Sequence, residues 1–141
     1  MYNKNSLDTV CSSLCYALGI DAPTQAAQGN HEMNSFIDNA FNGKKAEKMF
    51  IYNPDAVAQW VSEKYPEYMN EVFELTQIQV PLKSVMPSVT PVCFGTMYTG
   101  AQPEVHGIRK YEKPVIKIET LFDALIAVGK RVALITYSNC S

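Results

Sequence analysis

The sequence predicts an α/β fold, with a mainly parallel sheet flanked by helices. Three short segments have the composition of strands: an apolar run at 48–52, an alternating run at 77–82 and a continuous apolar run at 132–135. Segments with helical spacing of apolar residues separate them, and strands joined by helical crossovers pair in parallel. A strand as apolar as 132–135 is normally covered on both faces by helices. Because little chain follows this segment, we expect residues 1–141 to be the N-terminal part of a larger domain.

The chain before the first expected strand predicts two helices. Residues 6–18 place Leu7, Leu14 and Leu18 at helical spacing, and Gly19 is a natural stop. A polar stretch follows and predicts a loop. Residues 32–41 again have apolar side chains in helical phase, and Asn42-Gly43 ends that pattern.

The middle of the chain alternates between the two kinds of element. Asn53-Pro54 closes the first expected strand as a turn. Residues 56–64 then predict a helix, and Pro66 suits the first turn of another. Beyond the expected strand at 77–82, residues 91–99 predict a helix that ends at Gly100.

The last third predicts a short extended piece, a helix and the third strand. Residues 115–118 have an extended pattern, and residues 119–128 have helical spacing. Gly129 ends this helix just before the apolar run at 132–135.

Composition restricts the class of protein. With 12 Lys+Arg against 14 Asp+Glu, the net charge is −2, which gives no electrostatic reason to expect nucleic acid or an anionic membrane as a partner. No apolar run approaches the length of a membrane span, and the first residues carry no secretory signal, so we expect a cytoplasmic location. Four cysteines form no zinc-type spacing; Cys11 and Cys15 are expected as small apolar residues on a buried helix stripe.

In open α/β sheets, functional sites lie at the carboxyl ends of the strands. Three segments qualify here: 53–55, 87–100 and 137–140. Thr90 precedes Pro91 and a helical pattern, which puts its hydroxyl at the positive end of a helix, where anions bind. A hydroxyl beside a metal cation there could act as a nucleophile, although Thr90 could also be no more than a helix cap.

Asp55 offers the same two interpretations. Its carboxylate could hold a metal at the end of the first strand, or it could cap the following helix. If the first two strands are neighbours, Asp55 and Thr90 lie close together. A hard oxygen ligand beside a hydroxyl is the arrangement that metal-assisted phosphoryl transfer requires.

At residues 87–108 the sequence resembles the alkaline phosphatase superfamily, in particular its type I phosphodiesterase/nucleotide pyrophosphatase branch. The shared pattern is Pro87-Ser88-Val89-Thr90, then Thr99-Gly100, then Pro103-Glu104-Val105-His106-Gly107-Ile108. A weaker resemblance covers residues 49–56 and 121–137. The resemblance implies an alkaline-phosphatase-like fold and a hydrolase with two metal ions, usually zinc. It implies that Thr90 is the nucleophile and a metal ligand, and that Asp55 binds the same metal. His106 would brace its loop rather than bind metal.

The chain departs from the family pattern at three points. Ala56 stands where the family usually has glycine, and Cys93 stands where phosphodiesterases often have asparagine. The chain has only two histidines, His31 and His106, so it lacks the later Asp and His ligands of the second metal. We therefore expect a hydrolase of phosphate, phosphonate or sulfate esters that is incomplete in this chain and inactive by itself.

The expected partner is a small phosphoester or related anion, and neither a nucleic acid polymer nor a membrane. A sheet edge left open would also favour a homo-oligomer. The alternative is a non-catalytic α/β module that binds an anion or has only a structural role.

Overall fold

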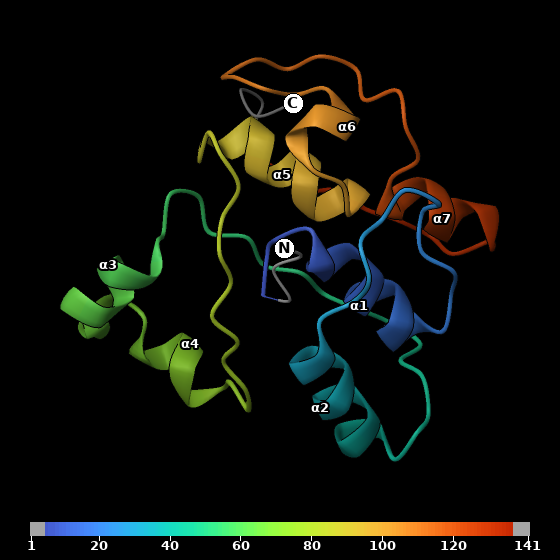
Figure 1. Ribbon diagram of the computed structural model, residues 1–141. Helices are drawn as coiled ribbons and strands as arrows, with labels where there is room; N and C mark the ends of the chain where they lie inside the picture. Colours follow the sequence, from blue (N-terminus) through green and yellow to red (C-terminus); the bar gives the residue numbers. More distant parts are fainter. Residues whose placement is uncertain (1–4, 137–141) are drawn as a thin grey trace.

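The computed structural model describes residues 5–136, which form a set of short helices joined by long connections (Figure 1). The elements, in chain order, are α1 (Thr9–Leu18), α2 (His31–Phe41), α3 (Gln59–Lys64), the 3₁₀ helix η1 (Pro66–Tyr68), α4 (Asn70–Glu74), α5 (Thr90–Thr99), α6 (Pro103–His106) and α7 (Leu121–Ala127). No strand is found among residues 5–136.

The predicted helices are confirmed, and their ends follow from local residue chemistry. Helix α1 ends at Gly19, whose φ of +66° is left-handed and suits a residue without a Cβ. At the start of α2, the Asn30 side chain accepts a hydrogen bond from the Met33 amide at 3.0 Å. At α7, Thr120 and Asp123 form a reciprocal capping box.

The predicted parallel sheet is wrong for the described residues. Segments 48–52, 77–82 and 132–135 contain no strand, and the described backbone forms a single isolated parallel bridge, between Ser6 and Lys83. Phe50 is 86% exposed and Ile135 is 92% exposed, so these apolar runs do not lie in a core. An apolar run shows only that its side chains would suit a half-buried strand. The strand itself forms only where a second backbone segment lies beside it and pairs with it.

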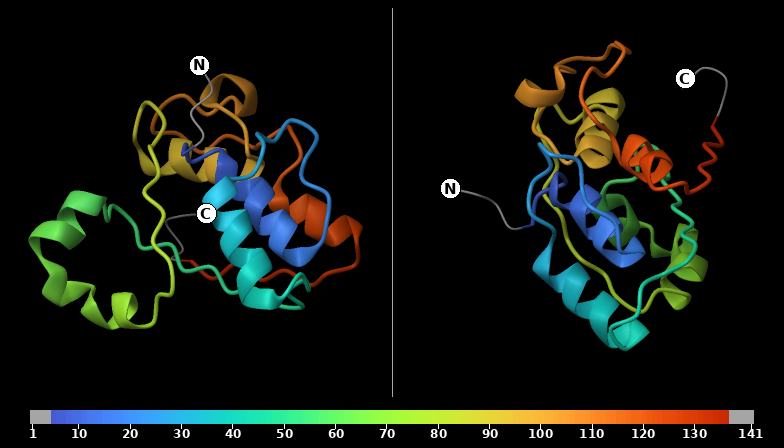
Figure 2. Two further views of the ribbon diagram at one scale, coloured as in Figure 1. Left: turned by 60° about the horizontal axis from the view of Figure 1, so that its bottom comes forward. Right: turned by 90° about the vertical axis from the view of Figure 1, so that its right-hand side faces the viewer.

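Helix α1 lies at the centre, between α2 and α5 (Figures 1 and 2). Helix α5 also contacts α6 and α7. Cys11, Cys15 and Leu121 form a buried cluster between α1 and α7, as expected of small apolar cysteines. A hydrogen bond to Cys15, together with burial, raises the pKa of the Cys11 thiol, which therefore stays protonated. A second cluster joins Val85 and Ile108 to α5.

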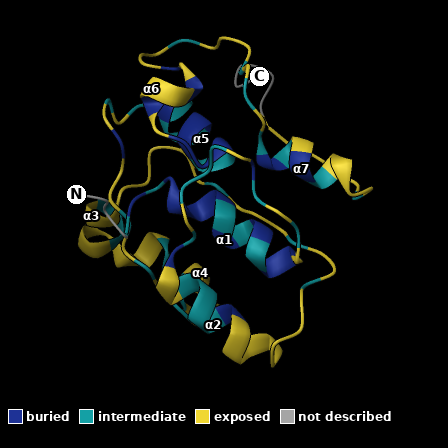
Figure 3. Ribbon diagram, turned by 45° about the vertical axis from the view of Figure 1, so that its right-hand side comes forward, coloured by how far each residue is buried: buried dark blue, intermediate teal, exposed yellow. Residues whose placement is uncertain are grey.

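Helices α3, η1 and α4 form a separate, exposed arm. They pack chiefly against one another, and Figure 2 shows them set apart from the central helices. Burial is concentrated in α1, α5 and α6, while α3 and much of α4 are exposed (Figure 3). Helix α5 therefore packs mainly on α1, α6 and α7 rather than on the arm. Within residues 5–136, no helix has the length and apolar character to cross a membrane.

Candidate functional site

The structure brings Asp55 and Thr90 into direct contact. The Thr90 hydroxyl donates a hydrogen bond to Oδ1 of Asp55, with 2.8 Å between the oxygens. Thr90 is the first residue of the ten-residue helix α5, and Pro91 follows it with the fixed φ that suits a first turn. The hydroxyl therefore lies at the positive end of a helix and beside a carboxylate.

Neither residue has the capping role that the sequence left open. Val89 is the N-cap of α5 and Ala58 is the N-cap of α3, and neither helix has a side-chain cap. The prediction that Asp55 and Thr90 follow two neighbouring strands is also wrong. Asp55 lies in a turn between two irregular segments, and the hydrogen bond joins that turn to α5. Their predicted roles as metal ligand and nucleophile stay predictions.

A second contact holds the same turn against α5. The Asn53 side-chain amide donates to the phenolic oxygen of Tyr98, near the other end of the helix. The Tyr98 ring packs on Phe94 and on Phe122 of α7, with centroids 5.9 and 4.8 Å apart. Burial is the main cause of the raised pKa of Tyr98, so its hydroxyl stays protonated. The turn that carries Asp55 is thus fixed at two points.

Asp55 and Thr90 line an open cleft of about 610 Å³. Its lining includes an apolar part formed by Leu82, Phe94 and Met97. No lysine or arginine lines the cleft among residues 5–136. A phosphoryl anion therefore meets a helix N-terminus that attracts it and an aspartate carboxylate that repels it, unless a cation separates the two anions.

The same cleft contains a chain of hydroxyl and thiol groups in which Cys93 was noted from the sequence, whereas the roles of Ser84 and Ser88 were missed. The Ser88 hydroxyl donates to the Ser84 hydroxyl at 2.8 Å, and Ser84 Oγ lies 3.3 Å from the Cys93 sulfur. Ser88 and Cys93 lie two residues before and three residues after Thr90 in the sequence. The closeness of Ser88 to Thr90 could have marked it, whereas Ser84 comes from the preceding segment and has no sequence signal.

His106 binds within its own loop, as the resemblance implied, and it also joins that loop to α5. It is 5% exposed; its Nδ1 accepts from the Ile108 amide at 3.2 Å, and its Nε2 lies 3.0 Å from the Thr96 hydroxyl. Because Nδ1 accepts, the ring is neutral and Nε2 carries the proton. Burial is the main cause of its lowered pKa. A Cβ at Gly95 would lie 2.9 Å from Cε1 of this ring, so the ring needs glycine there.

These contacts place Asp55, Thr90 and the His106 loop in one structural unit. Residues 54–114 match the family described as Type I phosphodiesterase / nucleotide pyrophosphatase. The matched segment contains all three features, so the resemblance predicted from the sequence is confirmed over these residues. No curated protein and no solved structure shows a significant match to the chain. The match supports a phosphoester hydrolase family.

The type I phosphodiesterase family is generally metal-dependent, and the described residues fit such a metal only in part. Asp55 supplies a carboxylate oxygen and Thr90 a hydroxyl oxygen, both suitable for a divalent cation. Within residues 5–136, no group of three or more His, Cys, Asp or Glu side chains could hold a metal ion. The described residues therefore do not complete a two-zinc centre. The third segment predicted from the sequence, 137–140, lies outside the described residues.

Proposed function

We propose that the chain carries the nucleophile of a metal-dependent hydrolase that acts on phosphate, phosphonate or sulfate esters. Thr90 is the proposed nucleophile, and Asp55 is the group that orients its hydroxyl and contributes to metal binding. The observation that carries the proposal is the 2.8 Å hydrogen bond from Thr90 to Asp55 at the start of α5. The family match across residues 54–114 supports the reaction class independently.

The proposed reaction follows from the direction of this hydrogen bond. Asp55 holds the hydroxyl proton at Oδ1, which leaves a lone pair of Thr90 Oγ1 free to attack phosphorus. Asp55 Oδ1 takes the Thr90 proton as the bond from Oγ1 to phosphorus forms. The bond from phosphorus to the ester oxygen breaks, and that oxygen takes a proton from solvent and leaves as the alcohol. Water then attacks phosphorus, the bond from phosphorus to Oγ1 breaks, and Asp55 returns its proton to Oγ1. The N-terminus of α5 favours the negative charge on the phosphoryl oxygens.

A divalent metal, which we propose to be zinc with two ions in the complete site, would lower the pKa of the hydroxyl and neutralise phosphoryl charge. The cleft gives a physical reason for a cation, because Asp55 is the charged side chain nearest Thr90 and no basic side chain lines the cleft among the described residues. Further ligands have to come from beyond the Asp55–Thr90 pair.

The proposed substrates are small esters whose organic group packs on the apolar part of the cleft lining. Phe94, Met97 and Leu82 form that part. The choice among phosphate, phosphonate and sulfate, a cytoplasmic location and self-association remain predictions. The lack of membrane and nucleic acid partners also remains a prediction.

A single-turnover experiment tests the proposal. The full-length gene product is incubated with Zn²⁺ or Mn²⁺ and with one substrate at a time: p-nitrophenyl phosphate, bis(p-nitrophenyl) phosphate or p-nitrophenyl sulfate. We expect a burst of nitrophenolate, no larger than the amount of protein, and an intact mass that increases by one phosphoryl, p-nitrophenyl phosphoryl or sulfuryl group according to the substrate. Peptide mapping should place that group on Thr90.

Two variants separate the nucleophile from other hydroxyls. Thr90→Ala should remove both the burst and the adduct, whereas Thr90→Ser should keep them. Thr76→Ala is the matched control, because the Thr76 hydroxyl only bonds a carbonyl within the exposed arm. An adduct that survives in Thr90→Ala contradicts the proposal. A chain that binds zinc and phosphate without transfer would instead be a non-catalytic anion-binding module.

A further inference from the structure

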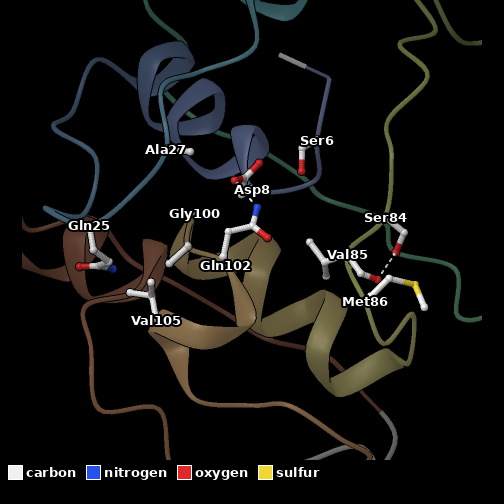
Figure 4. Close-up of a pocket in the computed structure, with 11 residues that line it drawn as sticks. Ser6, Asp8, Gln25, Ala27, Ser84, Val85, Met86, Gly100, Gln102 and Val105 are labelled. Carbon is white, nitrogen blue, oxygen red and sulfur yellow. Dashed lines mark hydrogen bonds between the residues drawn. The ribbon is translucent and has the colours of Figure 1, made fainter. Parts of the chain in front are cut away.

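A second cleft, of about 590 Å³, shares Ser84 with the first but does not have Thr90 in its lining (Figure 4). The start of α1, residues 25–27, residues 84–86 and the connection from α5 to α6 surround it. Its walls are largely apolar, and Val85 and Ala101 in them are buried. Among these apolar groups lies one charged side chain, Asp8.

Asp8 is buried and only half-satisfied. It is 4% exposed, and its Oδ2 accepts a hydrogen bond from the Gln102 side-chain amide at 2.6 Å. Its Oδ1 is buried and has no hydrogen-bond partner among residues 5–136. Asp8 stands at the N-cap position of α1 but makes no side-chain cap, so the helix does not use this oxygen either. A buried carboxylate without a counter-charge is costly, and an arriving cation would remove that cost.

The two glutamines in the lining use their side-chain nitrogens in hydrogen bonds within the protein. Gln102 uses its side-chain nitrogen on Asp8, and Gln25 uses its side-chain nitrogen on the carbonyls of Thr99 and Glu119. Carboxylates and carbonyls only accept, so these bonds fix both amide orientations. The side-chain oxygens of Gln25 and Gln102 therefore remain as acceptors.

We propose that this cleft, defined by Asp8, Gln25 and Gln102, binds a small organic cation with a primary ammonium group. The ammonium group has three donors and one positive charge, which suit the unpaired Asp8 Oδ1 and the amide oxygens. The apolar walls suit a short alkyl chain attached to it. No lysine or arginine lines the cleft among the described residues, so no side chain there already supplies the cation.

A bare metal ion is a poorer fit. Asp8 is the single carboxylate in the lining, whereas hard cations bind with six to eight oxygens around them. The apolar groups Ala27, Val85 and Ala101 would be left facing the ion's water shell. Calcium is accordingly an outcome that the experiment separates from the ammonium.

The test is a titration of the 141-residue chain at neutral pH with n-propylammonium chloride, followed by two-dimensional amide NMR. The neutral analogue n-propanol controls for the alkyl chain, potassium chloride for ionic strength, and calcium chloride for a metal site. We expect saturable shifts around Asp8, Gln25 and Gln102 with n-propylammonium alone. Shifts of equal size with n-propanol, or saturation by calcium without saturation by the ammonium, would overturn the proposal.

Variants locate the site. Asp8→Asn keeps the shape but removes the charge, and should weaken ammonium binding about tenfold or more, as loss of a buried charge pair does. Asp21→Asn, at an exposed carboxylate, is the matched control and should bind as the wild type does. Thr90→Ala should also bind normally, so failure of the proposed hydrolase activity leaves this result independent.

A second variant covers the case in which Asp8→Asn does not fold. Val105 lies on α6 and lines the same cleft (Figure 4). Val105→Lys places a tethered ammonium there, which should block n-propylammonium and raise the melting temperature. Unchanged ammonium binding in a folded Val105→Lys chain would overturn the proposal, as would unchanged binding in a folded Asp8→Asn chain.

Discussion

The contact between Gly95 and His106 makes a prediction whose sign depends on the background in which it is measured. In a helix interior, Gly→Ala normally stabilises by about 1 kcal/mol. At Gly95 the new Cβ would lie 2.9 Å from Cε1 and 3.0 Å from Nδ1 of the buried His106 ring. The ring would have to move, at an overpacking cost of about 1–3 kcal/mol. Weakening its bonds to Thr96 and Ile108 costs about 1 kcal/mol more. The propensity gain offsets part of these two costs, so we expect Gly95→Ala to lower the free energy of unfolding by about 1–3 kcal/mol.

The double variant separates this cause from others. In a His106→Ala background the ring is gone, and the remaining close atom is the flexible end of Ile108, 3.0 Å away. Gly95→Ala should then stabilise, by up to about 1 kcal/mol. Urea unfolding followed by far-UV circular dichroism measures all four proteins. Equal destabilisation by Gly95→Ala in both backgrounds would refute the reasoning, because it would show that the ring is not what excludes the Cβ.

Three further predictions concern stability. Burial lowers the pKa of His106, so the folded chain binds fewer protons there than the unfolded chain, and the free energy of unfolding should fall as pH drops below about 6.5. His106→Asn should reduce this pH dependence between pH 7 and 5. If the slope of the free energy of unfolding against pH is unchanged in the variant, another group causes the dependence. Leu121 is 1% exposed, so Leu121→Ala should cost about 2–5 kcal/mol in urea unfolding, and a loss below 1 kcal/mol would place it outside the core. Ala56 has a φ of +55°, which costs an L-residue about 1–2 kcal/mol, so Ala56→Gly should stabilise by up to about 1 kcal/mol. The control Ala127→Gly, within helix α7, should destabilise by about 1 kcal/mol. If both substitutions change the free energy of unfolding in the same direction, the backbone at Ala56 is not strained.

Helices could be predicted from the sequence because their signals are local. The ends of α1, α2, α5 and α7 follow from Gly19, Asn42, Gly100 and a Thr120 cap, each within a few residues of the pattern it closes. Strands depend on partners elsewhere in the chain. The apolar run 132–135 has the composition of a buried strand, yet Leu134 is 66% exposed because no neighbouring strand pairs with it in the described structure.

The candidate site likewise combines residues that the sequence predicts with residues whose place depends on tertiary contacts. Asp55 and Thr90 were identified from motif spacing, and they do meet, but through a turn rather than at a sheet edge. Ser84 could not be identified, because its place near Thr90 depends on how residues 84–90 fold back. Asp8 could not be identified either, because the contact of its carboxylate with Gln102 joins residues that are 94 positions apart. Tertiary contacts of this kind have no local sequence pattern.

The most direct test of the central claim is the rate of adduct formation at Thr90 in wild type and in Asp55→Asn. With p-nitrophenyl phosphate and Zn²⁺, peptide mass spectrometry should find the phosphoryl group on Thr90 in the wild type. Because Asp55 Oδ1 accepts the Thr90 proton, Asp55→Asn should slow formation of that adduct about 10²–10⁴-fold. A wild-type adduct at another residue, or an Asp55→Asn chain that labels Thr90 at the wild-type rate, would contradict the assignment of this pair.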